Sequence, residues 1–360
     1  MNDTLQSRLA SLSLPELGLS LGDAGARIRV AEAEGRVAVE VGVGFPSAWL
    51  ESWLRPEVER AVAESGLSLS TLVLTSRIAS HAVQEKLSPL PAVRNIIAVG
   101  SGKGGVGKST VAVNLALALA SDGAKVGVLD ADIYGPSVPL MLGIHGRPDS
   151  PDGKTIEPMR AHGVEAMSIG LLVDQDTPMI WRGPMATSAL TQLLTETRWG
   201  GVDGEGLDYL ILDLPPGTGD IQLTMAQKIP VAGAVVVTTP QDVATLDARK
   251  ALKMFEKVNV TVLGLIENMA VHVCSNCGHA EHIFGEGGGQ RMAAQYGVQL
   301  LGSLPLEARV REQGDAGVPI VAAGAESVTA RHFRLTARRL AIELSRRPHV
   351  ARPLAVSLLG

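Results

Sequence analysis

The spacing of apolar positions differs between the first quarter of the chain and the rest. Before residue 87, three short stretches read as strands and one longer stretch has the spacing of a helix. These segments are Ala26–Ala31, Arg36–Val43 and Leu67–Thr75 for the strands, and Ala48–Ser65 for the helix. They predict a small α+β domain over residues 1–86. Two prolines in the next few residues indicate a linker at 87–93.

From residue 94 onward, continuous apolar runs alternate with longer stretches of helical spacing. This alternation predicts an α/β domain over 94–360, built on a mainly parallel sheet flanked by helices. The predicted strands are Asn95–Val99, Lys125–Leu129, Val164–Ile169, Tyr209–Leu212, Ala234–Thr239, Val260–Ile266 and Gln299–Leu301. The predicted helices are Val111–Ala120, Met185–Thr197, Ala244–Lys257 and Val328–Ser345.

A glycine-rich segment between the first of these strands and the first helix has the spacing of a phosphate-binding loop. Backbone N–H groups of such a loop surround the phosphates, Lys108 reaches the β and γ oxygens, and the Ser109 hydroxyl ligates Mg²⁺. We therefore predict that the chain binds a nucleotide triphosphate together with Mg²⁺. The predicted contacts in the loop are Gly102, Gly104, Gly105, Val106, Gly107, Lys108, Ser109 and Thr110.

Two acidic residues follow buried strands at the edge where ligands bind in parallel sheets. Asp132 follows the second strand, and Asp213 ends the strand at Tyr209–Leu212. An aspartate in such a position supports Mg²⁺ or senses the γ-phosphate, although it can also simply cap the next helix.

A second lysine in the loop, Lys103, is not required by an ordinary phosphate-binding loop. Lying between two glycines, it can project toward another protomer and stabilise transition-state charge there, or it can simply be solvated. The first possibility predicts a homodimer.

The composition of the chain bears on the cellular compartment of the protein and on the kinds of partner that it can bind. The net charge of −5 argues against a protein that mainly binds nucleic acid, and two cysteines are too few for a disulfide scaffold. The start of the chain lacks a secretory signal pattern, and no long apolar run free of charges suggests a membrane span. We expect a cytoplasmic protein with neither membrane nor nucleic-acid partners.

The two cysteines, Cys274 and Cys277, have the spacing of a metal-binding or redox pair. A redox pair usually opens a helix, whereas this pair precedes a glycine-rich loop. Zinc would require His279 and His282, but His279 lies unusually close to Cys277. An iron–sulphur cluster takes four thiolates, which a symmetric dimer of this chain would supply. All three interpretations stay open, and inert thiols are the fourth.

Residues 94–346 resemble the Mrp/ApbC family of iron–sulphur cluster carriers, within the MinD/ParA/nitrogenase-iron-protein class of ATPases. The resemblance is carried by Lys103–Ser109, Asp132–Ser137, Asp213–Asp220 and Glu267–Met269 followed by the cysteine pair. It implies that Lys103 acts in trans, that Asp132 positions the attacking water, and that Asp213 supports Mg²⁺ through water. It also implies that Asn268 reads the adenine edge, that the turn Gly302–Pro305 closes over the base, and that a [4Fe–4S] cluster bridges Cys274 and Cys277 of two chains.

The first domain resembles the SufT-like iron–sulphur assembly domain more weakly. Leu14–Gly18 is similar to its Asp-Pro-Glu-Leu-Gly element, with Leu14 in place of the aspartate. Phe45 stands before Pro46 where that domain commonly has a cysteine. We therefore expect a scaffolding or docking role that needs no thiol.

These observations favour an ATP-hydrolysing carrier that passes clusters to apoproteins, with cluster scaffold proteins as further partners. A MinD/ParA-like positioning ATPase with a zinc or redox cysteine pair is the alternative. It would need a membrane helix or a basic DNA-binding face, and the arginines of Val328–Ser345 sit on a helix whose apolar spacing favours packing on the sheet. An ATP-dependent enzyme acting on a small molecule would need a further acid or base, for which the sequence offers no candidate.

Overall fold

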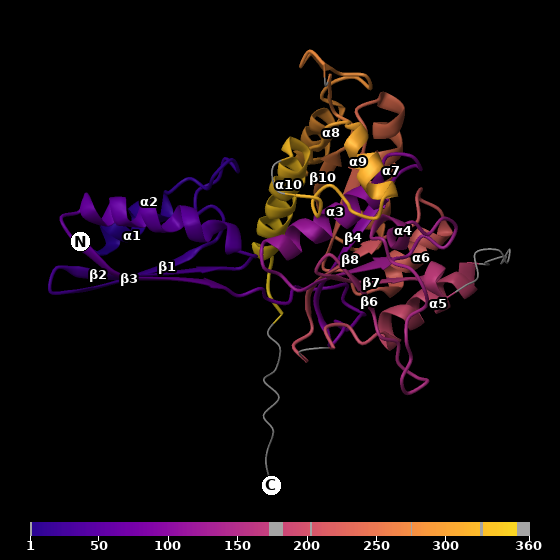
Figure 1. The fold of residues 1–360 in the computed structure, drawn as a ribbon, viewed down its shortest axis with the longest axis horizontal. Coiled ribbons are helices and arrows are strands. Elements are labelled where there is room, and N and C mark those ends of the chain that lie inside the picture. The colour runs from indigo at the N-terminus through magenta and orange to yellow at the C-terminus, as the bar shows by residue number, and fades with distance from the viewer. Residues whose placement is uncertain (1, 173–182, 202–203, 275, 325–326, 351–360) are drawn as a thin grey trace, which may run out of the picture.

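The computed structural model describes residues 2–172, 183–201, 204–274, 276–324 and 327–350. Figure 1 shows a larger α/β part and a smaller, elongated N-terminal part that extends away from it beside helix α10 (Val328–Ser345). The predicted fold class, a mainly parallel sheet flanked by helices with a small α+β unit before it, is confirmed. The division at residues 87–93 stays a prediction.

The larger part is built on eight strands in the order β13-β10-β9-β4-β8-β5-β7-β6. All neighbouring strands pair in parallel except β6, which pairs antiparallel with β7 at one edge. The central strands are buried along their whole length, as the continuous apolar runs predict. The strands are β4 (Val93–Ser101), β5 (Val126–Asp130), β6 (Met159–Ala161), β7 (Val164–Ser168), β8 (Leu207–Asp213), β9 (Gly233–Thr238), β10 (Val262–Glu267) and β13 (Leu300–Ser303).

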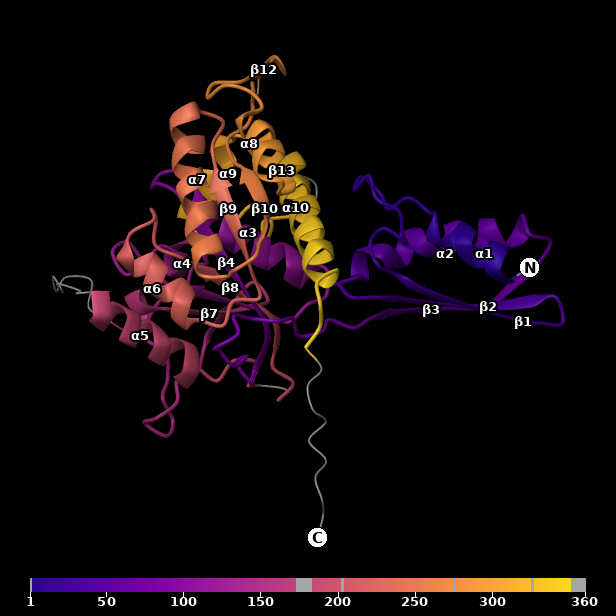
Figure 2. The same cartoon turned by 180° about the vertical axis from the view of Figure 1, so that it is seen from behind.

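Helices cover both faces of this sheet. Helix α3 packs against α10 on one side, while α7 and α8 pack against each other and against β9 and β10 (Figure 2). Helices α5 and α6 pack against each other, and the short helix α4 packs against α9. The helices are α3 (Lys108–Ser121), α4 (Val138–Met141), α5 (Gly183–Glu196), α6 (Asp220–Lys228), α7 (Asp242–Lys257), α8 (Gly288–Tyr296) and α9 (Ala308–Asp315). No helix in the described ranges is both long and apolar enough to cross a membrane.

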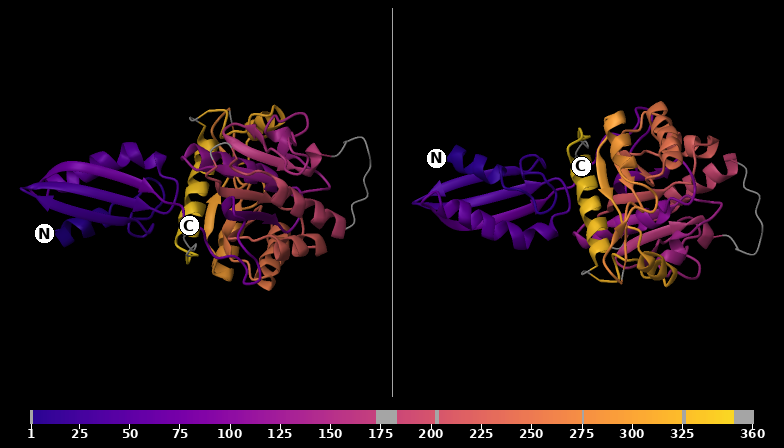
Figure 3. Two further views of the ribbon diagram at one scale, coloured as in Figure 1. Left: turned by 90° about the horizontal axis from the view of Figure 1, so that it is seen from below. Right: turned by 90° about the horizontal axis from the view of Figure 1, so that it is seen from above.

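In the N-terminal part, α1 (Asn2–Ala10) and α2 (Glu51–Ala63) lie over one face of a three-stranded sheet (Figure 3). Strand β2 (Arg36–Val43) pairs antiparallel with β1 (Arg27–Ala33) and parallel with β3 (Ser68–Ser76). Every second residue of β2, starting at Val37, is buried under the helices. Phe45 is also buried, with 1% of its surface exposed, so this site holds a core side chain instead of a reactive thiol.

The two parts meet where the end of α3 faces α10 and the turn before α2. Asp122, which caps α3, accepts two hydrogen bonds from the Arg338 guanidinium, at 2.8 Å from Nε and 2.9 Å from Nη2. The same guanidinium lies over the Trp49 ring, 4.4 Å from its centroid. The Asp122 carbonyl accepts a hydrogen bond from the Ala48 N–H at 3.1 Å. Burial raises the pKa of Asp122, although Arg338 opposes that effect.

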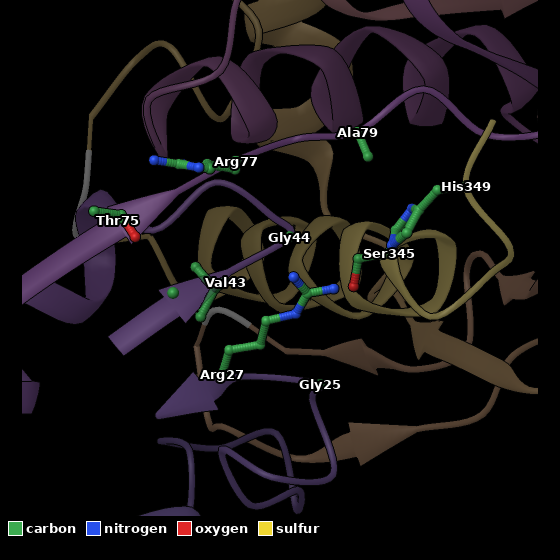
Figure 4. Close-up of a pocket in the computed structure, with 10 residues that line it drawn as sticks. Gly25, Arg27, Val43, Gly44, Thr75, Arg77, Ala79, Ser345 and His349 are labelled. Atoms are coloured by element: carbon green, nitrogen blue, oxygen red, sulfur yellow. The ribbon is translucent and has the colours of Figure 1, made fainter. Parts of the chain in front are cut away.

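A cavity of about 330 Å³ lies beside this contact, between the end of the three-stranded sheet and the end of α10. Figure 4 shows Arg27 extending from β1 toward Ser345, with His349 beyond it. The cavity belongs to the contact between the two parts, and it contains none of the residues that the sequence predicts to bind nucleotide or metal.

Candidate nucleotide and cysteine sites

The glycine-rich loop connects the end of β4 to the first turn of α3, as the sequence predicts. Gly105 and Gly107 both have φ of +79°, a backbone conformation that favours glycine. Gly107 precedes Lys108, the first residue of α3, so the helix begins where its backbone N–H groups can face an anion.

Two residues from other parts of the chain lie very close to glycines of this loop and constrain its backbone. A side-chain carbon on Gly102 would lie 2.0 Å from the backbone of Asp247 in α7, and one on Gly107 would lie 2.3 Å from Nδ2 of Asn268. Asn268 donates a hydrogen bond from that nitrogen to the Val106 carbonyl at 2.9 Å. The glycines therefore serve packing as well as phosphate contact. The adenine contact of Asn268 stays a prediction.

Lys108 and Asp213 form a buried ion pair at the end of β8. The Lys108 ammonium also lies 3.1 Å from the Ser109 hydroxyl oxygen. Burial raises the pKa of Asp213, and Lys108 opposes that effect. The structure thus brings together three groups that the sequence assigns to phosphate and Mg²⁺ binding.

Two buried carboxylate oxygens in this site accept no hydrogen bond from any described residue: Oδ2 of Asp213 and Oδ1 of Asp132. An orphaned buried oxygen is costly unless a ligand satisfies it, and Mg²⁺ with its water shell prefers oxygen ligands. The donor set formed by these carboxylates and the Ser109 hydroxyl fits a hydrated Mg²⁺. Burial also raises the pKa of Asp132.

Asp130 is a further acidic residue, which the sequence analysis did not single out. Its carboxylate accepts hydrogen bonds from the backbone N–H groups of Asp132, Ser137 and Val138 at 3.0–3.1 Å, and from the Ser168 hydroxyl at 3.2 Å. Burial and the neighbouring Asp213 raise the pKa of Asp130 to about 7. Asp130 therefore shapes the loop that carries Asp132. Its position as the last residue of β5 was the available signal.

Lys103 lies in the loop between Gly102 and Gly104, and its side chain forms no hydrogen bond or ion pair with any described residue. Its backbone carbonyl accepts a hydrogen bond from the Ser101 hydroxyl at 2.9 Å, which orders the start of the loop. The side chain is thus available to a second molecule. The trans role of Lys103 stays a prediction.

A cavity of about 310 Å³ opens beside the loop, between the first turn of α3 and the segment leading into α9. Its lining includes Gly107, Thr110, Asn268, Pro305 and Leu306. The position agrees with an adenosine site next to the phosphates. Pro305, the last residue of the turn predicted to close over the base, is part of this lining.

The cysteine pair lies on a short hairpin between β11 (His272–Val273) and β12 (Ala280–Glu281), which Figure 2 shows projecting at one extremity of the α/β part. The Cys274 N–H donates to the His279 carbonyl at 2.9 Å, and the Cys274 carbonyl accepts from the Gly278 N–H at 2.9 Å. Backbone N–H groups of Cys277 and Asn276 lower the pKa of Cys274 by hydrogen bonding to it.

Cys274 is partly exposed and Cys277 is exposed. In the described ranges, no three His, Cys, Asp or Glu side chains cluster in a way that could hold a metal ion. His272 and His282 instead each place Nδ1 within hydrogen-bonding distance of a backbone carbonyl. A single chain therefore offers two cysteine side chains in one turn, and that turn stabilises the thiolate form of Cys274.

Residues 92–341 match the ParA family model described as the NUBPL iron-transfer P-loop NTPase. An iron–sulphur cluster carrier protein of Pseudomonas fragi is 60% identical over 264 residues, which cover 73% of this chain and 90% of that protein. A protein of the same name from Synechocystis is 43% identical over 349 residues, covering 95% of this chain and 98% of that protein.

Among solved structures, a nucleotide-binding protein from Archaeoglobus fulgidus in complex with ADP is 38% identical, with a TM-score of 0.56. The match covers 63% of this chain and 88% of that one. The cell division ATPase MinD of Pyrococcus furiosus, 22% identical with a TM-score of 0.50, shares the fold over 68% of this chain and 98% of its own. The ordered motifs, the sheet and these matches agree, and the chain belongs to the family of NUBPL iron-transfer P-loop NTPases.

Proposed function

We propose that this protein binds and hydrolyses ATP and carries an iron–sulphur cluster, which it assembles at a homodimer interface and transfers to apoproteins. The observation that carries the proposal is a hairpin with a partly exposed and an exposed cysteine in the same domain as a glycine-rich loop with the spacing of a phosphate-binding loop. The names of the relatives support the cargo, and the bound ADP of the Archaeoglobus protein supports the nucleotide.

The number of thiolates supports a bridging site. A [4Fe–4S] cluster takes four cysteine ligands, and each chain offers Cys274 and Cys277. Two hairpins related by a two-fold axis would supply four. Val273 and Ile283, beside the pair, are each 52% exposed, and apolar side chains of this kind favour burial against a second chain. A cluster held at such an interface can be released when the dimer opens.

The nucleotide chemistry follows from the residues around the loop. Lys108 would bind the β and γ phosphate oxygens, while Ser109 and Asp213 would hold Mg²⁺ directly or through water. Mg²⁺, when bound, neutralises charge on the phosphates. Asp132 would orient the attacking water from the loop that Asp130 shapes. Lys103 of the partner chain would stabilise charge that develops on the transferred phosphoryl group.

The recipients are apo iron–sulphur proteins, and cluster scaffold proteins are further partners. In this proposal the cycle takes place in the cytoplasm, where thiols stay reduced and a transferable cluster can persist. The N-terminal domain contributes docking instead of a thiol, because Phe45 occupies its core.

Anaerobic reconstitution with iron and sulphide tests the proposal. We expect about four irons and four sulphides per dimer in the wild type, and their loss in the Cys274→Ala/Cys277→Ala variant. A Lys103→Ala variant should keep its cluster and its affinity for ATP but lose most of its ATPase activity, because it lacks the trans cation.

The double-cysteine variant should keep its affinity for ATP, which makes it the control for folding. A cluster that persists without the cysteines, or a wild type that never takes one up, would remove the carrier assignment. Zinc bound at one ion per chain would favour the metal-site alternative instead.

A further inference from the structure

We infer that His272 is a positioning residue that ties the cysteine hairpin to the segment lining the nucleotide cavity, so that nucleotide in the cavity alters how the cysteines are presented. The inference rests on the proposed function, because it concerns the same cysteines and the same cavity. It adds the physical connection between them.

The connection begins with a segment that has two sides. Pro305 and Leu306 line the nucleotide cavity with one side of the segment 304–306. The backbone of the same segment runs beside residues 267–271 and is hydrogen-bonded to them at three points. These are Leu304 N–H to the Glu267 carbonyl (2.8 Å), Ala270 N–H to the Leu304 carbonyl (2.9 Å), and Leu306 N–H to the Val271 carbonyl (2.8 Å).

His272 extends this contact into the hairpin. Its Nδ1 lies 3.1 Å from the Leu306 carbonyl oxygen. A carbonyl oxygen only accepts, so Nδ1 carries the hydrogen and donates it. Cys274 follows two residues later, just after β11 (His272–Val273). The side chain thus fastens the first strand of the hairpin to a residue of the cavity wall.

The second strand of the hairpin is fastened in a similar way. Nδ1 of His282 lies 2.9 Å from the Ala270 carbonyl oxygen. Ala270 is itself hydrogen-bonded to Leu304, so both strands depend on the same backbone pairing. The exposed hairpin lies between His272 and His282, and the hydrogen bonds of these two histidines set its orientation.

The residues just before the hairpin also contact the phosphate-binding loop. Asn268 donates to the Val106 carbonyl, as described above. The buried carboxylate of Glu267 accepts from the Gly289 N–H at 2.7 Å and from the Ser303 hydroxyl at 3.2 Å. Gly289 lies in α8, which follows the hairpin along the chain. The segment that carries the cysteines therefore starts just after Glu267 and Asn268, and the helix that follows it is hydrogen-bonded back to Glu267.

A tie of this kind lets nucleotide in the cavity alter the position of the hairpin, so the rate at which the cysteines react depends on nucleotide. The test measures alkylation of Cys274 and Cys277 by iodoacetamide in cluster-free protein, with and without Mg²⁺ and ADP or a non-hydrolysable ATP analogue. We expect nucleotide to change the wild-type rate by about fivefold. In His272→Ala this response should disappear while the affinity for nucleotide stays within about twofold.

Two further variants separate positioning from simple loss of structure. His272→Asn places an amide nitrogen where Nδ1 stood and should restore the response. His279→Ala removes an exposed histidine of the same hairpin, whose side chain bonds to no described residue, and should leave the response intact. A wild type whose alkylation ignores nucleotide, or a His272→Ala variant that still responds, would overturn the inference.

Cluster binding is read separately from iron content, so the two proposals fail differently. Suppose that the wild type takes up no cluster, but that its alkylation responds to nucleotide and this response is lost in His272→Ala. This result would refute the carrier assignment and support the role of His272. A chain that carries a cluster but whose alkylation rate does not respond to nucleotide would support the carrier assignment and refute the role of His272.

Discussion

A buried ion pair between α3 and α10 lies beside the contact with the N-terminal part, and breaking it should be costly. Arg338 and Asp122 expose only 18% and 6% of their side chains, and the guanidinium makes two hydrogen bonds to the carboxylate. In Arg338→Ala, Asp122 would stay buried without its partner. Removing one member of such a pair costs about 3–5 kcal/mol. Loss of the guanidinium from the Trp49 ring adds about 1 kcal/mol.

The matched control is Arg331→Ala on the same helix. Arg331 pairs with Glu16 of the N-terminal part at 2.6 Å, but the two side chains are 61% and 43% exposed. Solvent screens such a pair, so its loss should cost at most about 1 kcal/mol. The two variants thus compare a buried ion pair beside the contact with an exposed ion pair across it.

Urea unfolding followed by tryptophan fluorescence would measure both losses, because Trp49 lies at the contact. Limited proteolysis of the segment between β3 and β4 should show earlier cleavage in Arg338→Ala only. The double variant Asp122→Ala/Arg338→Ala should lose less than the sum of the single losses. If Arg338→Ala unfolds within about 1 kcal/mol of Arg331→Ala, the reasoning about burial is wrong.

Two further predictions concern the nucleotide site. Gly107→Ala should abolish ATP binding in an equilibrium titration without unfolding the protein, because its side chain would meet Asn268 at 2.3 Å and its φ is +79°; a variant that binds ATP normally would contradict this. Asp130 has a pKa raised to about 7, so the folded state holds a proton that the unfolded state has already lost, and its contribution to stability falls as pH rises. The cost of Asp130→Asn in nucleotide-free protein should therefore shrink by about 2–3 kcal/mol from about pH 5 to about pH 7.5. Any pH dependence of the free energy of unfolding that persists in the Asp130→Asn variant comes from other groups, such as His81 and His332, whose burial lowers their pKa.

The sheet and the phosphate-binding loop could be predicted from the sequence because each has a local signal. Continuous apolar runs mark buried parallel strands, and the glycine and lysine spacing marks the loop. Helix α1 was missed because only two of its residues, Leu5 and Leu9, are buried apolar side chains. The edge strand β6 was missed because it is short and partly exposed, so it carries no continuous apolar run.

The parts of the site that were not predicted depend on contacts between distant segments. Asp130 and Asp132 are both plausible ligands in sequence, and only the backbone hydrogen bonds show that Asp130 holds the loop while an oxygen of Asp132 stays unsatisfied. Asn268 contacts the carbonyl of Val106, 162 residues earlier in the chain. His272 is likewise defined by its acceptor in a segment more than thirty residues later. Local sequence patterns cannot predict contacts between residues that lie this far apart in the chain.

Helix α3 begins at Lys108 in the phosphate-binding loop and ends at Ser121, and the capping residue Asp122 contacts the N-terminal part. Its 14 residues span about 21 Å, so the N-terminal part is attached at the end of the helix farthest from the phosphates. Two copies that face each other across their nucleotide sites would therefore hold their N-terminal parts as outward arms. Such a dimer would be elongated, and a protein bound by one arm would leave the central interface unobstructed.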